Sequence, residues 1–166
     1  MDVETDAGVR SCEVAGALVE VSMGRVRVLG ERSLEVEGLL LLPWLADAGN
    51  PHAVLFGEHA AGDPERLGPR IATHSAFPQG TNVGFAAVRE GRVDLVVWER
   101  GVGLTLACGT GACAAVAVAC ERGLLPGGAS VDVRLPGGTL TVTRDAASGE
   151  TRLRGPARHV FAGQLP

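Results

Sequence analysis

Cys108 is the side chain in this sequence whose surroundings best suit proton transfer. It follows a short apolar step, Leu104 to Ala107, and precedes a Gly109-Thr110-Gly111 segment. Residues 112–120 then carry no polar side chain except thiols, which is typical of a helix buried on every face. Free backbone N–H groups at the start of such a helix favour an anion, so we expect the pKa of the Cys108 thiol to fall toward neutrality. Such a thiol can take and return a proton.

The Gly-Thr-Gly segment has two interpretations. Its glycines let the backbone approach a ligand closely, and Thr110 can cap the helix start. The segment also fits the dinucleotide fingerprint G-x-G-x-x-A, which ends here at Ala114. That fingerprint needs an acidic residue near the end of the following strand, whereas Asp132 lies inside its strand among hairpin patterns. We therefore reject a dinucleotide-binding fold.

Three further turns or strand ends carry more polar groups than a turn needs. They are Asn50 with His52, Thr81 with Asn82, and Glu99 with Arg100. An asparagine amide offers donors and an acceptor, an arginine offers a planar fork for a carboxylate, and a helix start binds anions. Together these groups match the needs of a zwitterionic amino-acid ligand.

Each of these polar groups also has a structural interpretation. Asn50 precedes a proline and can be a simple turn residue, and His52 alone indicates little. Glu99 and Arg100 can be a solvated ion pair.

The remaining cysteines are assigned no chemistry. Cys113 and Cys120 are expected to be small core residues of the buried helix, and Cys12 is expected to have no role. The spacing of the four cysteines fits no zinc site, so we predict no metal. Thiols of this kind suit a reducing compartment, which favours a cytoplasmic location.

Composition limits the remaining classes of function. The chain has 166 residues, 46% hydrophobic and 20% charged, enough to bury a core in one domain or two small ones. Its net charge is −4 and it has no basic run, so we expect no nucleic-acid partner. Its apolar stretches are too short and glycine-rich to span a bilayer, and no signal peptide is evident, so we expect no membrane partner.

The elements that must position the polar residues are mostly short strands. Strands are expected over Val14–Val21, Arg25–Val28, Leu34–Glu37, Leu39–Leu42, Ala53–Phe56, Asn82–Val88, Arg92–Glu99, Val131–Leu135, Leu140–Thr143, Thr151–Arg154 and Val160–Phe161. Met23-Gly24 is expected to interrupt the first two strands. A helix begins at Pro64 with Asp63 as its N-cap and ends before Ser75. This pattern predicts an α+β fold, a mostly antiparallel sheet wrapped around a central buried helix.

Several gapped motifs in this order resemble the diaminopimelate epimerases, cofactor-independent enzymes of lysine and peptidoglycan synthesis. The motifs are Gly49-Asn50-Pro51-His52, Gly80-Thr81-Asn82-Val83, Trp98-Glu99-Arg100-Gly101, Ala107-Cys108-Gly109-Thr110-Gly111-Ala112 and Gly155-Pro156-Ala157. The resemblance implies a chain of two similar halves, each a sheet around a helix, with the active site between them. It implies that residues 1–22 are a remnant of the first half, 23–158 the C-terminal epimerase-like domain, and 159–166 a tail returning to the first half.

The resemblance also implies roles for single residues. Cys108 is one of two acid/base cysteines, and the other belongs to a missing N-terminal half-domain. Substrate-binding positions are implied at Asn50, Asn82, Glu99, Arg100, Gly109 and Thr110. His52 supports the cysteine, and no cofactor is implied. The implied activity is interconversion of LL- and meso-diaminopimelate, with this chain inactive or nearly so alone.

Three other functions remain open. The chain can belong to a racemase of another amino acid such as histidine, to a cysteine-dependent hydrolase or acyl transferase, or to a non-catalytic amino-acid-binding domain. Strand edges near residues 1–22 and 159–166 would be exposed without a second half, so we expect a homodimer or a larger assembly.

Overall fold

The computed structural model of the chain describes residues 1–5, 8–57 and 63–164. Within these residues the chain forms fourteen strands and two helices. The strands are β1 (Asp2–Thr5), β2 (Gly8–Ala15), β3 (Leu18–Arg25), β4 (Arg27–Glu31), β5 (Leu34–Val36), β6 (Leu39–Leu41), β7 (Trp44–Asp47), β8 (Pro51–Phe56), β9 (Asn82–Arg89), β10 (Arg92–Glu99), β11 (Gly103–Thr105), β12 (Ser130–Leu135), β13 (Gly138–Arg144) and β14 (Glu150–Pro156). The helices are α1 (Pro64–Ala72) and α2 (Gly109–Glu121).

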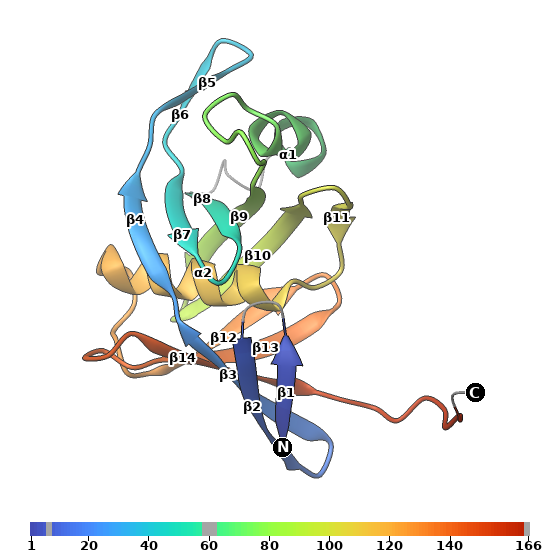
Figure 1. The fold of residues 1–166 in the computed structure, drawn as a ribbon. Coiled ribbons are helices and arrows are strands. Elements are labelled where there is room, and N and C mark those ends of the chain that lie inside the picture. The colour runs from blue at the N-terminus through green and yellow to red at the C-terminus, as the bar shows by residue number, and fades with distance from the viewer. Residues whose placement is uncertain (6–7, 58–62, 165–166) are drawn as a thin grey trace.

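Twelve of these strands form one curled sheet. Their order is β1-β2-β3-β14-β13-β12-β10-β9-β8-β7-β4, with β11 added beside β10. Only β8–β9 and β10–β12 pair in parallel among the described strands. β3 and β4 are joined through Val26 yet pair with different neighbours, so the sheet curls back around α2, which crosses its middle (Figure 1). The predicted α+β class, a mostly antiparallel sheet around a central helix, is confirmed.

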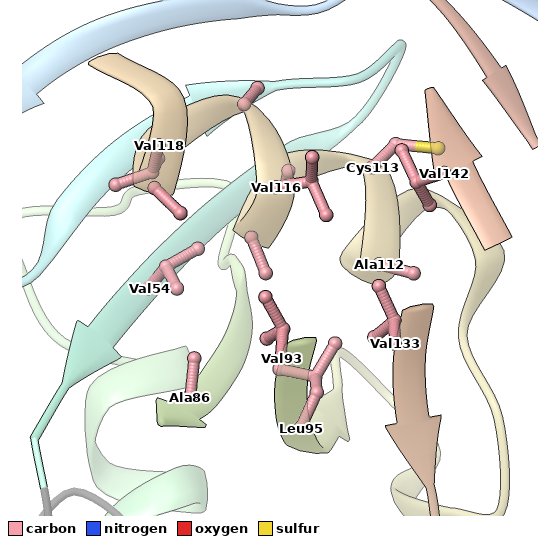
Figure 2. Close-up of a cluster of buried hydrophobic side chains, with 14 of the residues drawn as sticks. Val54, Ala86, Val93, Leu95, Ala112, Cys113, Val116, Val118, Val133 and Val142 are labelled. Carbon is pink, nitrogen blue, oxygen red and sulfur yellow. The ribbon is translucent and has the colours of Figure 1, made fainter. Parts of the chain in front are cut away.

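Helix α2 is buried on all faces. Residues 112–119 are 0% exposed. Side chains from the surrounding strands, including Val54, Ala86, Leu95 and Val133, point toward the helix in Figure 2. Alanine, valine and cysteine are small enough to let strands approach from every side, and burial of their apolar surface stabilises the arrangement by about 25 cal/mol per Å². The surrounding sheet, rather than an amphipathic pattern, therefore fixes the helix in place.

Helix α1 covers the outer side of the sheet. Its N-cap Asp63 accepts a hydrogen bond from the Arg66 backbone N–H at 2.9 Å, and Pro64 occupies the start of the helix, as predicted. Its buried face packs on Val83 and Phe85 of β9, whereas Ala86 of β9 belongs to the core around α2. β9 therefore lies between the two helices, which explains its long run of buried residues.

Three expected strand assignments are wrong. The single strand expected over Val14–Val21 is divided by a turn at Gly16-Ala17, where β2 ends and β3 begins. Met23-Gly24 does not interrupt a strand but lies inside β3, where the register with β14 shifts between Thr151 and Arg152 and leaves Met23 unpaired as a bulge. Val160 and Phe161 form no strand: they lie in an extended tail, are 86% and 80% exposed, and have no neighbouring strand to pair with (Figure 1). The division at residues 22 and 158 stays a prediction.

Candidate active site

Strand ends and the start of α2 meet on one side of the sheet. His52 of β8 lies directly beside Asn82, the first residue of β9. Val83 pairs with Trp98, so Glu99 at the end of β10 lies near the start of β9. Cys108, the N-cap of α2, is within interaction range of the Glu99 carboxylate. The sheet register therefore gathers residues that are far apart in the sequence.

A chain of hydrogen bonds connects the turn before β8 to the Cys108 thiol. Asn50 Oδ1 lies 3.0 Å from His52 Nε2. The same ring nitrogen lies 3.1 Å from Thr110 Oγ1, and this hydroxyl lies 3.6 Å from Cys108 Sγ. Asn50, His52, Thr110 and Cys108 thus form one group, which we call the thiol cluster.

The state of the Cys108 thiol differs from the sequence-based expectation. Cys108 is 6% exposed, and this burial raises the pKa of its thiol above the ordinary value. Hydrogen bonds from the Thr110 hydroxyl and the Gly111 backbone lower the pKa, while the nearby Glu99 carboxylate raises it further. The predicted fall toward neutrality is wrong because the loss of water outweighs the helix start. Cys108 is a protonated thiol at neutral pH.

The role expected for Thr110 as the helix cap is also wrong. The N-cap residue is Cys108, and no side chain makes the capping hydrogen bond. The Thr110 hydroxyl instead lies between His52 and Cys108, where it can polarise the thiol. Gly111 allows this close contact, since a Cβ there would lie 3.2 Å from Cys108 Sγ.

His52 is a neutral imidazole. Burial lowers its pKa from 6.5 to about 4, although the negative charge of Asp47 acts in the opposite direction. Because the Asn50 side-chain oxygen only accepts, His52 Nε2 carries the hydrogen and donates it. His52 Nδ1 is then an unprotonated nitrogen, buried without a hydrogen-bond partner in the described chain. His52 therefore orients Asn50 and Thr110 rather than bearing a charge.

Asn82 and Arg100 form a second group beside the thiol cluster. Asn82 Oδ1 accepts the Arg100 backbone N–H at 2.9 Å, which fixes the turn after β10. Arg100 Nη1 donates to the Gln79 carbonyl at 2.6 Å. The stem of Arg100 crosses Gly80, where a Cβ would lie 2.7 Å from Arg100 Cδ.

Arg100 lines a hollow of about 600 Å³ whose other walls include Phe77, Trp98 and Val102 but not Cys108 or Thr110. Glu99 lies between this second group and the thiol cluster. The structure thus places Asn50, His52 and Thr110 in the hydrogen-bonded group that contains the thiol. Asn82 and Arg100 form a separate group, with Glu99 between it and the thiol cluster.

Two contributors were missed from the sequence. Asp47 acts on His52 electrostatically and accepts the Gly49 backbone N–H at 2.9 Å. An acidic residue two positions before a glycine is an Asx-turn signal that could have revealed it. The Gln79 carbonyl left no sequence signal, because any residue type supplies the same backbone group. The contribution of the Gly111 backbone to the thiol is of the kind expected from the free N–H groups at a helix start.

The other cysteines lie away from the thiol cluster or are buried. Cys113 is fully buried in α2, and burial raises the pKa of its thiol to about 12. Cys120 is partly exposed near the end of the same helix, and burial raises its pKa as well. Cys12 shares a hollow of about 330 Å³ with Thr110 and Met23.

Neither a metal-ligand cluster nor a membrane-spanning helix occurs in residues 1–5, 8–57 and 63–164. No group of three or more His, Cys, Asp or Glu side chains there is arranged to hold a metal ion. No helix in the same residues is long and apolar enough to cross a membrane.

Comparisons with known proteins single out one family. The sequence profile described as diaminopimelate epimerase matches residues 44–160. The diaminopimelate epimerase of Xylella fastidiosa strain M23 is 47% identical over 142 residues, which cover 84% of this chain and 49% of that protein. The diaminopimelate epimerase of Thermosynechococcus vestitus is 41% identical over 185 residues, covering 99% of this chain and 65% of that protein. The chain spans about half the length of the Xylella relative.

Solved structures share the fold at lower identity. A probable proline racemase from Agrobacterium radiobacter K84 superposes with a TM-score of 0.76 at 18% identity, over 99% of this chain and 59% of that chain. At this identity the likeness concerns the fold alone, and it agrees with a sheet wrapped around a buried helix.

Proposed function

Because the chain belongs to the diaminopimelate epimerase family, we propose that it supplies one of two acid/base groups that invert an amino-acid α-carbon. The proposed substrate is diaminopimelate, and Cys108 is the proposed group. The observation that carries the proposal is the protonated Cys108 thiol at the start of α2, in contact with Thr110 and Glu99. The raised pKa keeps this thiol protonated at neutral pH, which is the state that a general acid needs before it gives up its proton.

The proposed reaction needs two opposed groups. A base on the far side of the α-carbon removes the α-proton, and the electron pair of that C–H bond is left on the substrate. Cys108 Sγ–H then delivers its proton to the opposite side, so a new C–H bond forms and a thiolate remains. In the reverse direction this thiolate is the base. Both groups are side chains, so the reaction requires no cofactor.

The substrate's carboxylate and amino groups are bound by the residues around the thiol. The free N–H groups at Gly109 and Thr110 lie at the start of α2, where an anion is favoured. Asn50, Asn82, Glu99 and Arg100 provide further polar contacts. His52 is a positioning residue, since its neutral ring holds Asn50 and Thr110.

The second acid/base group is proposed to come from an N-terminal half-domain. Support comes from the length of the relatives, because about half of the Xylella protein lies outside the alignment with this chain. In this proposal residues 1–22 and 159–166 pack with that half, and residues 23–158 form the half that contains Cys108. Thiol chemistry of this kind requires a reducing compartment, so we place the enzyme in the cytoplasm.

The test follows the α-proton in deuterated water. The purified chain is incubated with one stereoisomer of diaminopimelate, alone and with the first half of a relative added as a separate polypeptide. We expect little exchange from the chain alone, and exchange with inversion when the first half is present. Cys108→Ala should abolish inversion, with Cys113→Ala as the matched control on the same helix.

Other outcomes would favour the alternatives. Inversion of histidine but not of diaminopimelate would indicate that histidine is the substrate. Cleavage of a p-nitrophenyl ester that depends on Cys108 would indicate a hydrolase. Binding of diaminopimelate without exchange, even with the first half present, would indicate a binding domain.

A further inference from the structure

A basic hollow lies at the far end of α2 from the thiol cluster. It encloses about 460 Å³ and is lined by Arg25, Arg27, Val26, Val28, Leu29, Glu121 and Arg144. Three of these side chains are positively charged and one is negatively charged. No residue of the proposed active site lines this hollow.

Two of the three arginines have no ionic partner among the residues that the structure describes. Arg27 pairs with Asp47 at 2.5 Å, which neutralises its charge. Arg25 and Arg144 form no ion pair or side-chain hydrogen bond with any described residue, although Glu121 lines the same hollow. Arg144 Nε is in addition a buried N–H group without a hydrogen-bond partner. A buried donor left without a partner costs about 1–3 kcal/mol, more if charged, so the chain itself does not compensate this guanidinium.

The guanidiniums of Arg25 and Arg144 lie close to each other, on either side of Gly149. Arg144 Nη2 and Arg25 Nε each lie 3.5 Å from the position that a Cβ would take on Gly149. The two nitrogen atoms are therefore at most about 7 Å apart. Like charges at that distance repel each other, and an anion between them would turn the repulsion into attraction. One small anion can therefore reach both arginines.

Capping of α2 does not account for these arginines. The backbone N–H of Arg122 bonds the Val118 carbonyl, that of Gly123 bonds the Cys120 carbonyl, and that of Leu124 bonds the Ala119 carbonyl. The Val118, Ala119 and Cys120 carbonyls near the end of α2 are thus satisfied by the turn that follows the helix. The Arg25 and Arg144 side chains remain available.

We propose that Arg25 and Arg144 form a binding site for a phosphate-type oxyanion. A phosphate group has several acceptor oxygens and a charge near −2, and arginine forks bind it with paired hydrogen bonds. A carboxylate has one negative charge and fewer oxygens, so it would leave one guanidinium uncompensated. The ligand is free inorganic phosphate or the phosphate of a larger molecule such as a nucleotide.

Thermal unfolding and calorimetric titration test the site on the whole chain. Inorganic phosphate and adenosine monophosphate are added at matched ionic strength, with chloride and acetate as comparison anions. Because the chain has a net charge of −4, a general attraction for anions is not expected, and a saturable effect must be local. We expect phosphate to raise the unfolding temperature in a saturable way, more than chloride or acetate does.

Substitution of single arginines tests whether Arg25 and Arg144 bind the phosphate group. Arg144→Gln and Arg25→Gln should each weaken phosphate binding about tenfold or more, since each removes charge-assisted hydrogen bonds. Arg134→Gln is the matched control, because Arg134 is an exposed arginine at the opposite end of the β12–β13 pair. Arg25 is exposed, so its variant provides the test if Arg144→Gln does not fold.

Three outcomes would overturn the proposal. One is a phosphate effect no larger than that of chloride, and another is phosphate binding that both variants retain. The third is equal weakening by Arg134→Gln. Tighter binding of adenosine monophosphate than of inorganic phosphate would identify a larger phosphate-bearing ligand, and equal binding would identify the phosphate group itself.

Discussion

His52 is buried in a site where a positive charge is unfavourable, and it makes the stability of the chain depend on pH. Its pKa is 6.5 when exposed to water and about 4 in the folded chain. Between these values the unfolded chain binds a proton that the folded chain does not, so stability falls as pH falls from 6.5 to about 4. The shift corresponds to about 3 kcal/mol of unfolding free energy.

Urea unfolding at a series of pH values measures this effect. The wild-type chain should lose stability as the pH falls from 6.5 to about 4. The His52→Gln variant should lose about 3 kcal/mol less over the same pH range. His159→Gln is the control, because His159 is exposed in the tail. Equal pH dependence in wild type and His52→Gln would contradict a neutral buried imidazole.

The Thr110 hydroxyl tunes the Cys108 thiol. Its hydrogen bond lowers the pKa of the thiol and opposes the effect of burial. Thr110→Val should therefore raise the pKa further and slow alkylation of Cys108 at neutral pH, at a stability cost of about 1 kcal/mol. Peptide mapping after iodoacetamide treatment would measure the rate at Cys108 alone. Thr110→Ser keeps the hydroxyl and should behave as wild type, whereas faster alkylation of the valine variant would refute this role.

At the level of elements, each helix depends on a close approach to the sheet. For α1 the contact is at Gly68, where a Cβ would lie 2.7 Å from Trp98 Cβ and Cγ. Trp98 is followed by Glu99, the last residue of β10, and by Arg100 in the turn after that strand. The packing of α1 against Trp98 therefore affects the position of two proposed substrate-binding residues. Helix α2 likewise holds Cys108 only because the surrounding strands fit its small side chains.

The Gly68→Ala substitution has two opposing effects on stability, one from packing against Trp98 and one from helix propensity. Alanine is favoured over glycine in a helix by about 1 kcal/mol, but here its methyl group would clash with the rigid Trp98 ring. We expect a net loss of about 1–3 kcal/mol, measured from urea unfolding followed by tryptophan fluorescence. Glu65→Ala, on the exposed side of α1, should change stability by no more than about 0.5 kcal/mol. A more stable Gly68→Ala variant would show that the helix is free to move outward.

On the scale of the whole molecule, the first strands and the tail extend from the body that surrounds α2 (Figure 1). β1 is an end strand of the sheet, and the hairpins from β1 to β3 expose Val9 and Val14 at 64% and 63%. The tail exposes Val160 and Phe161. Apolar side chains beside an unpaired strand edge are typical of surfaces that bind another chain.

We therefore predict that the isolated chain associates into a homodimer or a larger assembly. Light scattering coupled to size-exclusion chromatography over a dilution series would give its mass. The double substitution Val9→Lys and Val14→Lys should shift the chain toward monomer, while Val102→Lys, at an equally exposed position near β11, should not. A monomer of wild type at high concentration would refute the prediction.

The sequence by itself determined the local elements and the choice of chemically active residues. The uniformly apolar residues 112–120 predicted a helix buried on every face, and Asp63-Pro64 predicted the start of the other helix. Both signals are local, because caps and hydrophobic patterning act over a few neighbouring residues. Gapped motifs located Cys108 and its polar companions, since each motif places a required side chain or glycine at one turn.

Only the tertiary structure decided how those residues behave. The Cys108 thiol is protonated because distant strands exclude water from it, and desolvation depends on all neighbours rather than on the helix alone. The same burial lowers the pKa of His52, and register between β8 and β9 brings His52 beside Asn82. The proximity of Arg25 and Arg144 is likewise set by the strand order, since they lie far apart in the sequence, on the two strands β3 and β13 that flank β14.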